Sequence, residues 1–256
     1  GALIQGMIAG GLVNAEAVTV ADTDEARLAE LARSCKVLVT ADNREAVRNA
    51  DLIILAVKPQ NMAEVLAGLT AAMVPSALVI SIAAGISTAF IEERLGEGVR
   101  VVRVMPNMPA LIGEGAAAIA PGGHATEADL KRTRHIFDAV GITVEVKEDL
   151  MDAVTGLSGS GPGYVFLIVE AFVDAGVRMG LPRETALKLI AQSFLGAAKL
   201  CLLGEKPPAE LRAMVTSPGG TTLAGLKVME EGKLREILMA AVEAATKRSA
   251  ELGGRK

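Results

Sequence analysis

Short, apolar, β-branched runs alternate with helix-like segments from residue 18 to about residue 147, and this alternation constrains the fold most strongly. Nearly continuous apolar strands that alternate with helices are typical of a parallel sheet covered by helices on both faces. The predicted strands are 18–22, 36–40, 51–57, 78–83, 99–105, 115–122 and 142–147. The sequence therefore predicts an open, doubly wound α/β domain over residues 1–150.

After about residue 150 the strand pattern stops and three helices are expected, over 161–180, 183–204 and 232–252. The first of these is apolar almost all round, and a helix without a polar face is expected to be buried on every side. The other two show ordinary amphipathic spacing. An all-helical domain is therefore predicted over residues 151–256. In the first half, Thr126 and Asp129 have the spacing of a capping box at a helix start.

Composition narrows the class of protein. Hydrophobic residues make up 51% of the chain but aromatic residues only 2%, and the net charge of −4 argues against a basic nucleic-acid-binding surface. Mean hydropathy is +0.40, yet no uninterrupted apolar run has the length of a membrane span. The surplus apolar surface is expected to lie between subunits. Cys35 and Cys201 form neither a disulfide framework nor a metal-ligand motif, as expected for a cytoplasmic protein.

The segments that follow the predicted strands are candidate ligand contacts, because open α/β sheets bind ligands outside the carboxyl ends of their strands. "AVKP" at 56–59 could face a cofactor through its backbone and Lys58, or simply end a strand. "SIAAG" at 81–85 could let a flat ligand approach closely or serve helix packing. "MPNMP" at 105–109 holds Asn107 between two prolines. Asp22 could bind the ribose hydroxyls of NAD or cap the following helix.

The stretch "TSPGGTT" at 216–222 places four hydroxyls and two glycines before a helical segment. With Ser217 as N-cap and Pro218 as the first helical residue, the N–H groups of Gly219, Gly220 and Thr221 would be unpaired donors at the positive end of the helix. An ordinary turn with an N-cap needs one hydroxyl and no glycine, so the pattern favours an anion site. "GLSGSGPGY" at 156–164 is a second such helix start, for which close helix packing is the preferred interpretation.

No strong protein base is evident in the sequence. His124 lies in a Gly-rich loop and His135 on an amphipathic helix, and both are expected at the surface. No nucleophile elbow, His–carboxylate pair or H-E-x-x-H motif is present. The chemistry is therefore expected to need neither a strong protein base nor a metal.

Five segments, "AVKP", "SIAAG", "MPNMP", "DAVTGLSGSGPGY" and "TSPGGTT", resemble pyrroline-5-carboxylate reductases in order and separation. The resemblance covers essentially the whole chain and implies a Rossmann-like domain that binds NADPH or NADH, followed by a helical domain. That helical domain would interlace with a second subunit in a homodimer, which can assemble further into rings such as decamers. The family's first strand and glycine loop are expected to precede Gly1, which could be the loop's last glycine.

The resemblance also implies roles for individual residues. The dinucleotide contacts fall on Gly1, Asn43, Ala56, Val57, Lys58, Pro59 and Ala84. The substrate carboxylate falls on Ser217, Gly219, Gly220 and Thr221, with Glu148 as a further position near the ligand. The Thr222 hydroxyl would hydrogen-bond the ring nitrogen while a hydride adds to the imine carbon, giving proline.

Two alternatives remain at this point. A β-hydroxyacid dehydrogenase shares the overall plan but would place a Lys base on the long helix of the second domain, where 161–177 has none. A catalytically silent dinucleotide-sensing scaffold is the other alternative, and the "TSPGGTT" stretch argues against it.

Overall fold

The computed structural model describes residues 1–254, which separate into two compact units. The sheet unit comprises residues 1–160 and the C-terminal segment from Glu243, and the helical unit comprises residues 161–242. This division differs from the predicted ranges 1–150 and 151–256. Residues after 150 stay with the sheet unit because Met151 is fully buried beside Ala118 and Ala120. The C-terminal segment stays there because the Ser249 hydroxyl donates a 2.8 Å hydrogen bond to Asp152.

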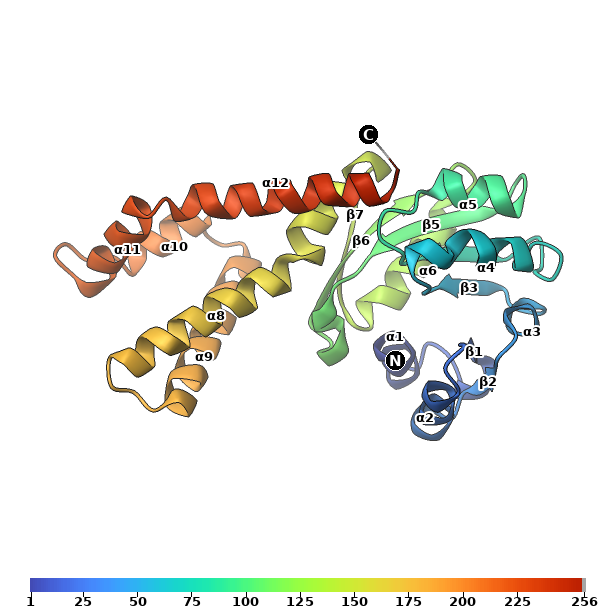
Figure 1. Ribbon diagram of the computed structural model, residues 1–256, viewed down its shortest axis with the longest axis horizontal. Helices are drawn as coiled ribbons and strands as arrows, with labels where there is room; N and C mark the ends of the chain where they lie inside the picture. The colour runs from blue at the N-terminus through green and yellow to red at the C-terminus, as the bar shows by residue number, and fades with distance from the viewer. Residues whose placement is uncertain (255–256) are drawn as a thin grey trace. The chain divides into compact units, whose positions relative to one another are not determined.

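Each strand predicted from the sequence is present in the sheet unit (Figure 1). β1 and β2 form a parallel pair, and the other five strands form a sheet in the order β3-β4-β5-β6-β7. Their bounds are β1 Thr19–Ala21, β2 Leu38–Thr40, β3 Leu52–Leu55, β4 Leu78–Ser81, β5 Arg100–Met105, β6 Gly115–Pro121 and β7 Gly141–Glu145. This is the predicted Rossmann-like architecture.

The sheet departs from an all-parallel pattern at one pair of strands. β5 and β6 are antiparallel, with Val102 opposite Pro121 and Met105 opposite Ala118. The connection between them, 106–114, contains only the short 3-10 helix Met108–Ile112. A parallel crossover needs about a dozen residues or more, so a connection this short turns the chain back on itself.

Helices cover both faces of the five-stranded sheet. Successive β4 residues point to opposite faces, so Val79 packs with α4 (Met62–Leu69) and α5 (Thr88–Leu95). Ile80 packs in the other cluster, with α1 (Ala2–Ala9) and α6 (Glu127–Asp138). Ile80 is fully buried, and burying a side chain of that kind contributes about 1.5–3 kcal/mol. These two layers confirm the doubly wound prediction. The remaining helices of this unit are α2 Glu25–Cys35, α3 Asn43–Val47 and α7 Met151–Val154.

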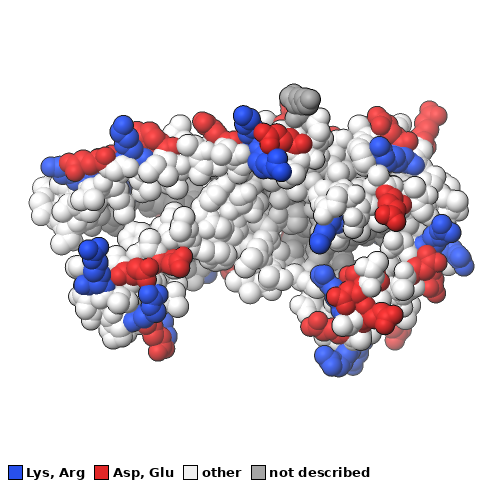
Figure 2. Space-filling view, viewed as in Figure 1, with Lys and Arg blue, Asp and Glu red and all other residues white. Residues whose placement is uncertain are grey.

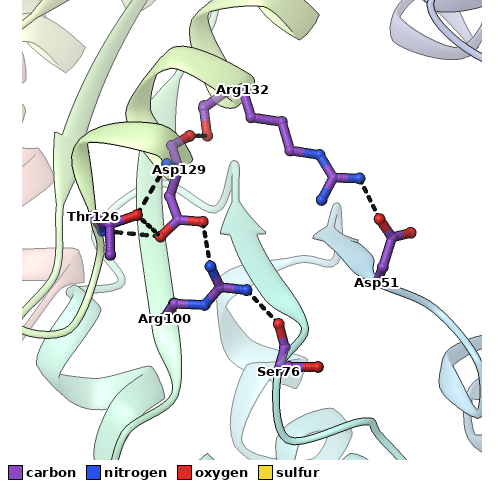
Figure 3. Close-up of polar contacts among 7 residues, drawn as sticks. Asp51, Ser76, Arg100, Thr126, Asp129 and Arg132 are labelled. Atoms are coloured by element: carbon purple, nitrogen blue, oxygen red, sulfur yellow. Dashed lines mark hydrogen bonds and ion pairs between the residues drawn. The ribbon is translucent and has the colours of Figure 1, made fainter.

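The predicted capping box opens α6 (Figure 3). The Thr126 hydroxyl accepts a hydrogen bond from the backbone N–H of Asp129, whose carboxylate accepts one from the N–H of Thr126 at 2.9 Å. Asp129 also pairs with Arg100 of β5 at 2.8 Å, and Arg100 donates to the carbonyl of Ser76. The cap therefore ties the start of α6 to the sheet.

The helical unit contains α8 (Gly161–Arg178), α9 (Arg183–Leu203), α10 (Pro208–Met214) and α11 (Thr221–Glu231). α12 (Leu234–Leu252) begins in this unit, and its C-terminal part belongs to the sheet unit. α8 and α9 pack on each other through the edge-to-face rings of Phe172 and Phe194, with centroids 6.0 Å apart. Gly176 lets the two helices approach closely, since a Cβ there would lie 2.9 Å from the Ala186 Cβ.

The prediction that the first long helix is buried on every side is wrong for a single chain. Val173 is the residue of α8 that is buried, whereas Phe166 is 54% and Leu167 67% exposed. The adjacent helix α9 also exposes leucines, Leu202 among them at 71%. One chain has too few neighbouring elements to cover α8, so the apolar surface is available to a partner.

Hydropathy averaged along whole helices is a different test from the search for uninterrupted apolar runs. Two continuous helical stretches, Glu148–Arg178 and Arg183–Leu203, are long and apolar enough by length and composition to span a membrane, with mean hydropathy 1.2 and 1.5. Isolated polar residues interrupt an apolar run, but they lower the mean hydropathy of a long helix only slightly. The property is shared by helices that pack against other protein, and it is weak support for a membrane span. On the face of the molecule in Figure 2, acidic and basic side chains are interspersed rather than gathered by sign.

Candidate functional site

The carboxyl ends of β3 and β4 bring most of the predicted nucleotide contacts to one edge of the sheet. The N–H of Ile82 donates to the carbonyl of Leu55 at 3.1 Å, so the chain leaves both strands side by side. The predicted contacts that follow these strands are Ala56, Val57, Lys58, Pro59 and Ala84. Lys58 is exposed and precedes the 3-10 helix Pro59–Asn61. The edge therefore offers backbone groups and the exposed ammonium group of Lys58 to a ligand.

Small residues lie along part of this edge of the sheet. Ala83 is 5% exposed, and the buried Gly85 has a φ of 76°, a left-handed conformation that favours glycine. A Cβ at Gly85 would lie about 3.0 Å from the backbone nitrogen of Gly253. The space beside Gly85 is therefore filled by the C-terminal segment, and Gly85 serves packing within the sheet unit, the alternative left open from the sequence.

Gly1 and Asn43 both lie at helix starts. Gly1 is the N-cap of α1, with its carbonyl accepting from Gln5 at 3.0 Å and no side-chain cap. Asn43 is the first residue of α3, where Asp42 provides the cap by accepting from the N–H of Arg44 at 2.9 Å. Unpaired N–H groups at a helix start favour anions such as a pyrophosphate.

Asp22 does not cap the following helix. Asp24 is the N-cap of α2 and accepts from the N–H of Arg27 at 3.1 Å. Asp22 instead accepts from the N–H of Asp24 at 3.1 Å and lies 3.7 Å from the Arg27 guanidinium. The prediction that Asp22 caps the following helix is therefore wrong. Its carboxylate, just after the end of β1, is paired with Arg27 of α2.

Glu148 belongs to a buried polar network. Its two carboxylate oxygens accept from the backbone N–H and hydroxyl of Thr88, at 2.7 and 2.6 Å, and Oε1 lies 3.4 Å from Arg103. Arg103 is 2% exposed and also lies 4.0 Å from Asp152, the acceptor of the Ser249 hydroxyl. Sequence reasoning missed Arg103, although a basic residue inside the apolar strand "VRVVRVM" was an available signal.

Asn107 connects two segments by both ends of its amide. Its oxygen accepts from the N–H of Ala116 at 2.9 Å, and its nitrogen donates to the carbonyl of Ser158 at 3.1 Å. Ser158 lies in a π-helical turn, Thr155–Gly159, and such turns are frequent at functional sites. The flanking prolines predicted a fixed amide, and the structure shows what fixes it.

The "TSPGGTT" stretch forms a turn followed by a helix, with a later helix start than predicted. The N–H of Gly220 donates to the carbonyl of Ser217 at 3.0 Å, and Gly219 has a φ of 70°, as in a type II turn with Pro218 at its second position. Gly220 is the N-cap of α11 and has no side-chain cap. The prediction of Ser217 as N-cap and Pro218 as first helical residue is therefore wrong.

This correction changes which backbone groups are available to an anion. The N–H of Gly220 is already used in the turn, so the donors at the helix start belong to Thr221, Thr222 and Leu223. Thr221 and Thr222 are both exposed. The structure places this loop in the helical unit and the predicted nucleotide contacts in the sheet unit.

Both histidines are exposed, as predicted. Within residues 1–254, no three or more His, Cys, Asp or Glu residues are grouped so as to hold a metal ion. The chemical groups that remain near the predicted sites are hydroxyls, backbone N–H groups, Lys58 and the Glu148 network.

Known proteins match the chain over nearly its whole length. Residues 148–252 match the family described as pyrroline-5-carboxylate reductase dimerisation, and residues 1–85 match the family described as NADP oxidoreductase, coenzyme F420-dependent. A pyrroline-5-carboxylate reductase from Methanosarcina acetivorans is 49% identical, over 98% of this chain and 93% of that protein. The Arabidopsis thaliana enzyme of that name is 41% identical, over 98% and 90%.

Solved structures of pyrroline-5-carboxylate reductases are also similar to this chain. A pyrroline-5-carboxylate reductase from Coxiella burnetii has a TM-score of 0.90 at 38% identity, covering 98% of this chain and 93% of that one. The Plasmodium falciparum pyrroline carboxylate reductase, solved with NADP bound, has a TM-score of 0.89 at 33% identity with the same coverage. Prephenate dehydrogenase from Aquifex aeolicus, at 15% identity and a TM-score of 0.53, shares the fold alone.

Proposed function

The chain belongs to the pyrroline-5-carboxylate reductase family, and from this premise we propose how its residues perform the NAD(P)H-dependent reduction of 1-pyrroline-5-carboxylate to L-proline. The observation that carries the proposal is the uncapped start of α11 beside the Pro218–Gly219 turn. It offers an anion site and a hydroxyl together. We assign the nucleotide to the sheet edge after β3 and β4.

The nucleotide is assigned to the sheet unit. We propose that Ala56, Val57, Lys58, Pro59 and Ala84 contact it at the strand ends, with Asn43 and Gly1 at adjoining helix starts. Bound NADPH, or NADH, supplies the hydride that adds to C5 of the imine. The NADP-bound Plasmodium relative and the match of residues 1–85 to an NADP oxidoreductase family support this assignment.

The substrate carboxylate is assigned to the start of α11. The N–H groups of Thr221, Thr222 and Leu223 would donate to it, with the positive end of the helix dipole adding to the attraction. Ser217, Gly219 and Gly220 contribute by shaping the turn that leaves this helix start open. A Cβ at Gly220 would meet the Ser217 hydroxyl, so a larger residue there would require the Ser217 side chain to move.

The Thr222 hydroxyl is assigned to the ring nitrogen. A protonated imine is already electrophilic, and its N–H can donate to the Thr222 oxygen. As the hydride adds to C5, the C=N π electrons move to nitrogen and the iminium charge is neutralised, giving proline. No protein base must remove a proton in this step, so positioning carries much of the rate enhancement.

We propose Glu148 as a further substrate contact, although its carboxylate can accept few additional hydrogen bonds. A carboxylate has about four acceptor positions, and Thr88 and Arg103 already occupy three. About one position therefore remains for a donor other than the imine, whose single N–H is assigned to Thr222.

The apolar surface of α8 and α9 and the match to a dimerisation family support a homodimer built on these helices. We place that dimer in the cytoplasm, acting on a small-molecule substrate without a nucleic-acid or membrane partner. Assembly of dimers into a larger ring, such as a decamer, is proposed from family resemblance.

Oxidation of NADPH and NADH by the full-length protein, with 1-pyrroline-5-carboxylate as substrate, tests the function. We expect substrate-dependent oxidation of at least one nucleotide and formation of proline. Nucleotide binding without turnover would support a silent scaffold, and turnover of 3-hydroxy acids with the oxidised nucleotide would support a hydroxyacid dehydrogenase. Either result, without proline formation, contradicts the proposal.

A further inference from the structure

The loop between β4 and α5, residues 82–87, is attached to the rest of the sheet unit at both ends. At its start, the N–H of Ile82 donates to the last carbonyl of β3 at 3.1 Å. Just after its end, Thr88 donates its N–H and its hydroxyl to Glu148. Ala84, a proposed nucleotide contact, lies between these two attachments.

The chain just beyond α12 contacts the middle of the same loop. A Cβ at Gly253 would lie 2.5 Å from the carbonyl oxygen of Gly85, so the two backbones meet without a side chain between them. The N–H of Gly253 donates to the carbonyl of Ser249 at 3.1 Å, so the last turn of α12 sets its position. Gly85 is buried and directly follows Ala84, which is partly exposed. The packing of Gly253 therefore restricts where Ala84 can lie.

The last turn of α12 is itself fixed by a buried side chain. Ser249 is 3% exposed, and its hydroxyl donates to Asp152 at 2.8 Å. Asp152 lies 4.0 Å from one terminal nitrogen of Arg103, and the other terminal nitrogen lies 3.4 Å from Glu148. A continuous path of polar contacts therefore connects Ser249 to the carboxylate that holds Thr88.

We propose that Ser249 and Gly253 are positioning residues that hold the 82–87 loop so that Ala84 meets the bound NAD(P)H. Neither residue is assigned a contact with the nucleotide. Ser249 acts through the polar path, and Gly253 acts through its contact with Gly85. This inference rests on the proposed function, because it takes Ala84 as a nucleotide contact. Changes in the last turn of α12 should therefore weaken nucleotide binding.

Two substitutions interrupt the two contacts separately. Ser249→Ala removes one hydrogen-bond donor to Asp152, while Glu148 keeps its three hydrogen bonds. Gly253→Ala places a methyl group against the Gly85 carbonyl. The φ of Gly253 lies outside the left-handed region, so the alanine introduces a steric conflict rather than backbone strain.

Nucleotide binding and steady-state kinetics of the full-length protein test the proposal. Isothermal titration calorimetry measures binding of NADPH and of NADH without substrate. We expect each substitution to raise the dissociation constant and the KM of the preferred nucleotide by about three- to tenfold, and KM for 1-pyrroline-5-carboxylate by less than about twofold. In the nucleotide-free protein, amide hydrogen exchange over residues 82–88 should be faster in both variants.

Ser34→Ala and Gly68→Ala are the matched controls, and both sites lie in the sheet unit. The Ser34 hydroxyl is exposed and donates to the carbonyl of Glu30 in its own helix, and a Cβ at Gly68 meets nothing within 4 Å. Both controls should leave nucleotide binding and exchange over 82–88 unchanged. A control that weakens nucleotide binding as much as its matched substitution overturns the inference.

A merely structural role would give a different result. It would lower the thermal midpoint of Ser249→Ala and Gly253→Ala but leave the nucleotide dissociation constant, measured well below that midpoint, unchanged. That result overturns the inference. Gly253 lies beyond the last residue of α12, so Gly253→Ala decides the test if Ser249→Ala fails to fold.

Failure of the inference and failure of the proposed function can be told apart. If the unsubstituted protein binds a nucleotide and forms proline, while both substitutions leave binding and KM unchanged, the inference fails and the proposed function stands. If the unsubstituted protein binds neither NADPH nor NADH, the proposed nucleotide site is wrong and the inference fails with it.

Discussion

Glu148 accepts two hydrogen bonds from Thr88, one from its backbone N–H at 2.7 Å and one from its hydroxyl at 2.6 Å. Thr88 is the first residue of α5, so the carboxylate satisfies a helix-start donor that would otherwise lack an intrahelical partner. The same carboxylate faces Arg103, whose guanidinium is almost entirely buried. The segment after β7 is thereby attached to a helix and a strand that precede it by many residues.

Removing this carboxylate charge should destabilise the fold. In Glu148→Gln, Arg103 loses part of its charge compensation in a buried setting, and breaking a buried pair costs about 3–5 kcal/mol. Glu148 is itself partly exposed, its side chain at 22%, and Asp152 remains close to Arg103. We therefore expect a loss of roughly 1–3 kcal/mol in the free energy of unfolding, measured by urea denaturation.

Glu145→Gln is the control for this change. Glu145 pairs with Arg134 at 3.2 Å, but both side chains are more than 40% exposed, and such pairs contribute about 0–1 kcal/mol. A loss in Glu145→Gln as large as that in Glu148→Gln would show that burial of Arg103 is not the cause.

Asp129 should make stability depend on acid pH. Burial raises the pKa of its carboxyl group, but hydrogen bonds from Thr126 and the charge of Arg100 outweigh burial and lower the pKa below the ordinary value. A lowered folded-state pKa stabilises the fold above the unfolded pKa, about 3.9, and that contribution is lost as the pH falls through the folded pKa. We expect Asp129→Asn to flatten the dependence of unfolding free energy on pH below about pH 4.

The control is Asp51→Asn. Hydrogen bonding to Arg132 likewise lowers the pKa of Asp51, but its side chain is 83% exposed, so solvent screens the pair (Figure 3). The effect of Asp51→Asn on the acid limb should be smaller than that of Asp129→Asn. The reverse order would contradict the role given to the capping box.

Local sequence signals predicted much of this fold. Alternating apolar runs located the strands, and the spacing of Thr126 and Asp129 predicted a cap that is present in detail. Two errors came from long-range geometry. The antiparallel β5–β6 pair follows from a connection too short for a crossover, and the exposure of α8 follows from surface that one chain cannot cover.

The sequence predicted which segments form the candidate site, but not the atomic contacts within those segments. "TSPGGTT" indicated an anion site, but whether Ser217 caps the helix depends on where the Pro218–Gly219 turn ends. The partners of Glu148 were not predictable because Thr88 and Arg103 are far from it in sequence. Only the fold brings those three residues together.

Thr222 should affect turnover without affecting stability. Thr222→Ala removes the hydroxyl proposed to bind the ring nitrogen, and we expect kcat/KM for 1-pyrroline-5-carboxylate to fall by the equivalent of about 1–3 kcal/mol. The side chain is exposed, so the thermal midpoint should hardly change. Thr222→Ser restores a hydroxyl and should recover most of the activity. Wild-type kinetics in Thr222→Ala would contradict the assignment of this hydroxyl to the ring nitrogen.

Gly219 should matter for substrate binding more than its strain alone predicts. Its φ of 70° lies in the left-handed region, where an alanine costs about 1–2 kcal/mol. Gly204 ends α9 with the same φ of 70°, and a Cβ at either glycine meets nothing within 4 Å. Gly219→Ala and Gly204→Ala should therefore destabilise to a similar extent.

The two variants should differ in steady-state kinetics. Because Gly219 shapes the helix start proposed to hold the carboxylate, Gly219→Ala should raise KM for 1-pyrroline-5-carboxylate several-fold, and Gly204→Ala should not. Equal KM values in the two variants would argue that the turn plays no part in binding the substrate.

Phe166 should be required for assembly. It is 54% exposed on α8, within the residues that match a dimerisation family, and burying an aromatic side chain of this size between subunits contributes about 1.5–3 kcal/mol. Phe166→Glu would instead place a charge in that contact. We expect the variant to dissociate to monomers at concentrations where the unsubstituted protein is dimeric, as measured by light scattering after size-exclusion chromatography. Leu38→Glu charges a similarly exposed leucine of β2 that lies outside residues 148–252, the match to the dimerisation family, and should leave the dimer intact. Dissociation by both variants would mean that added charge rather than the α8 surface is responsible.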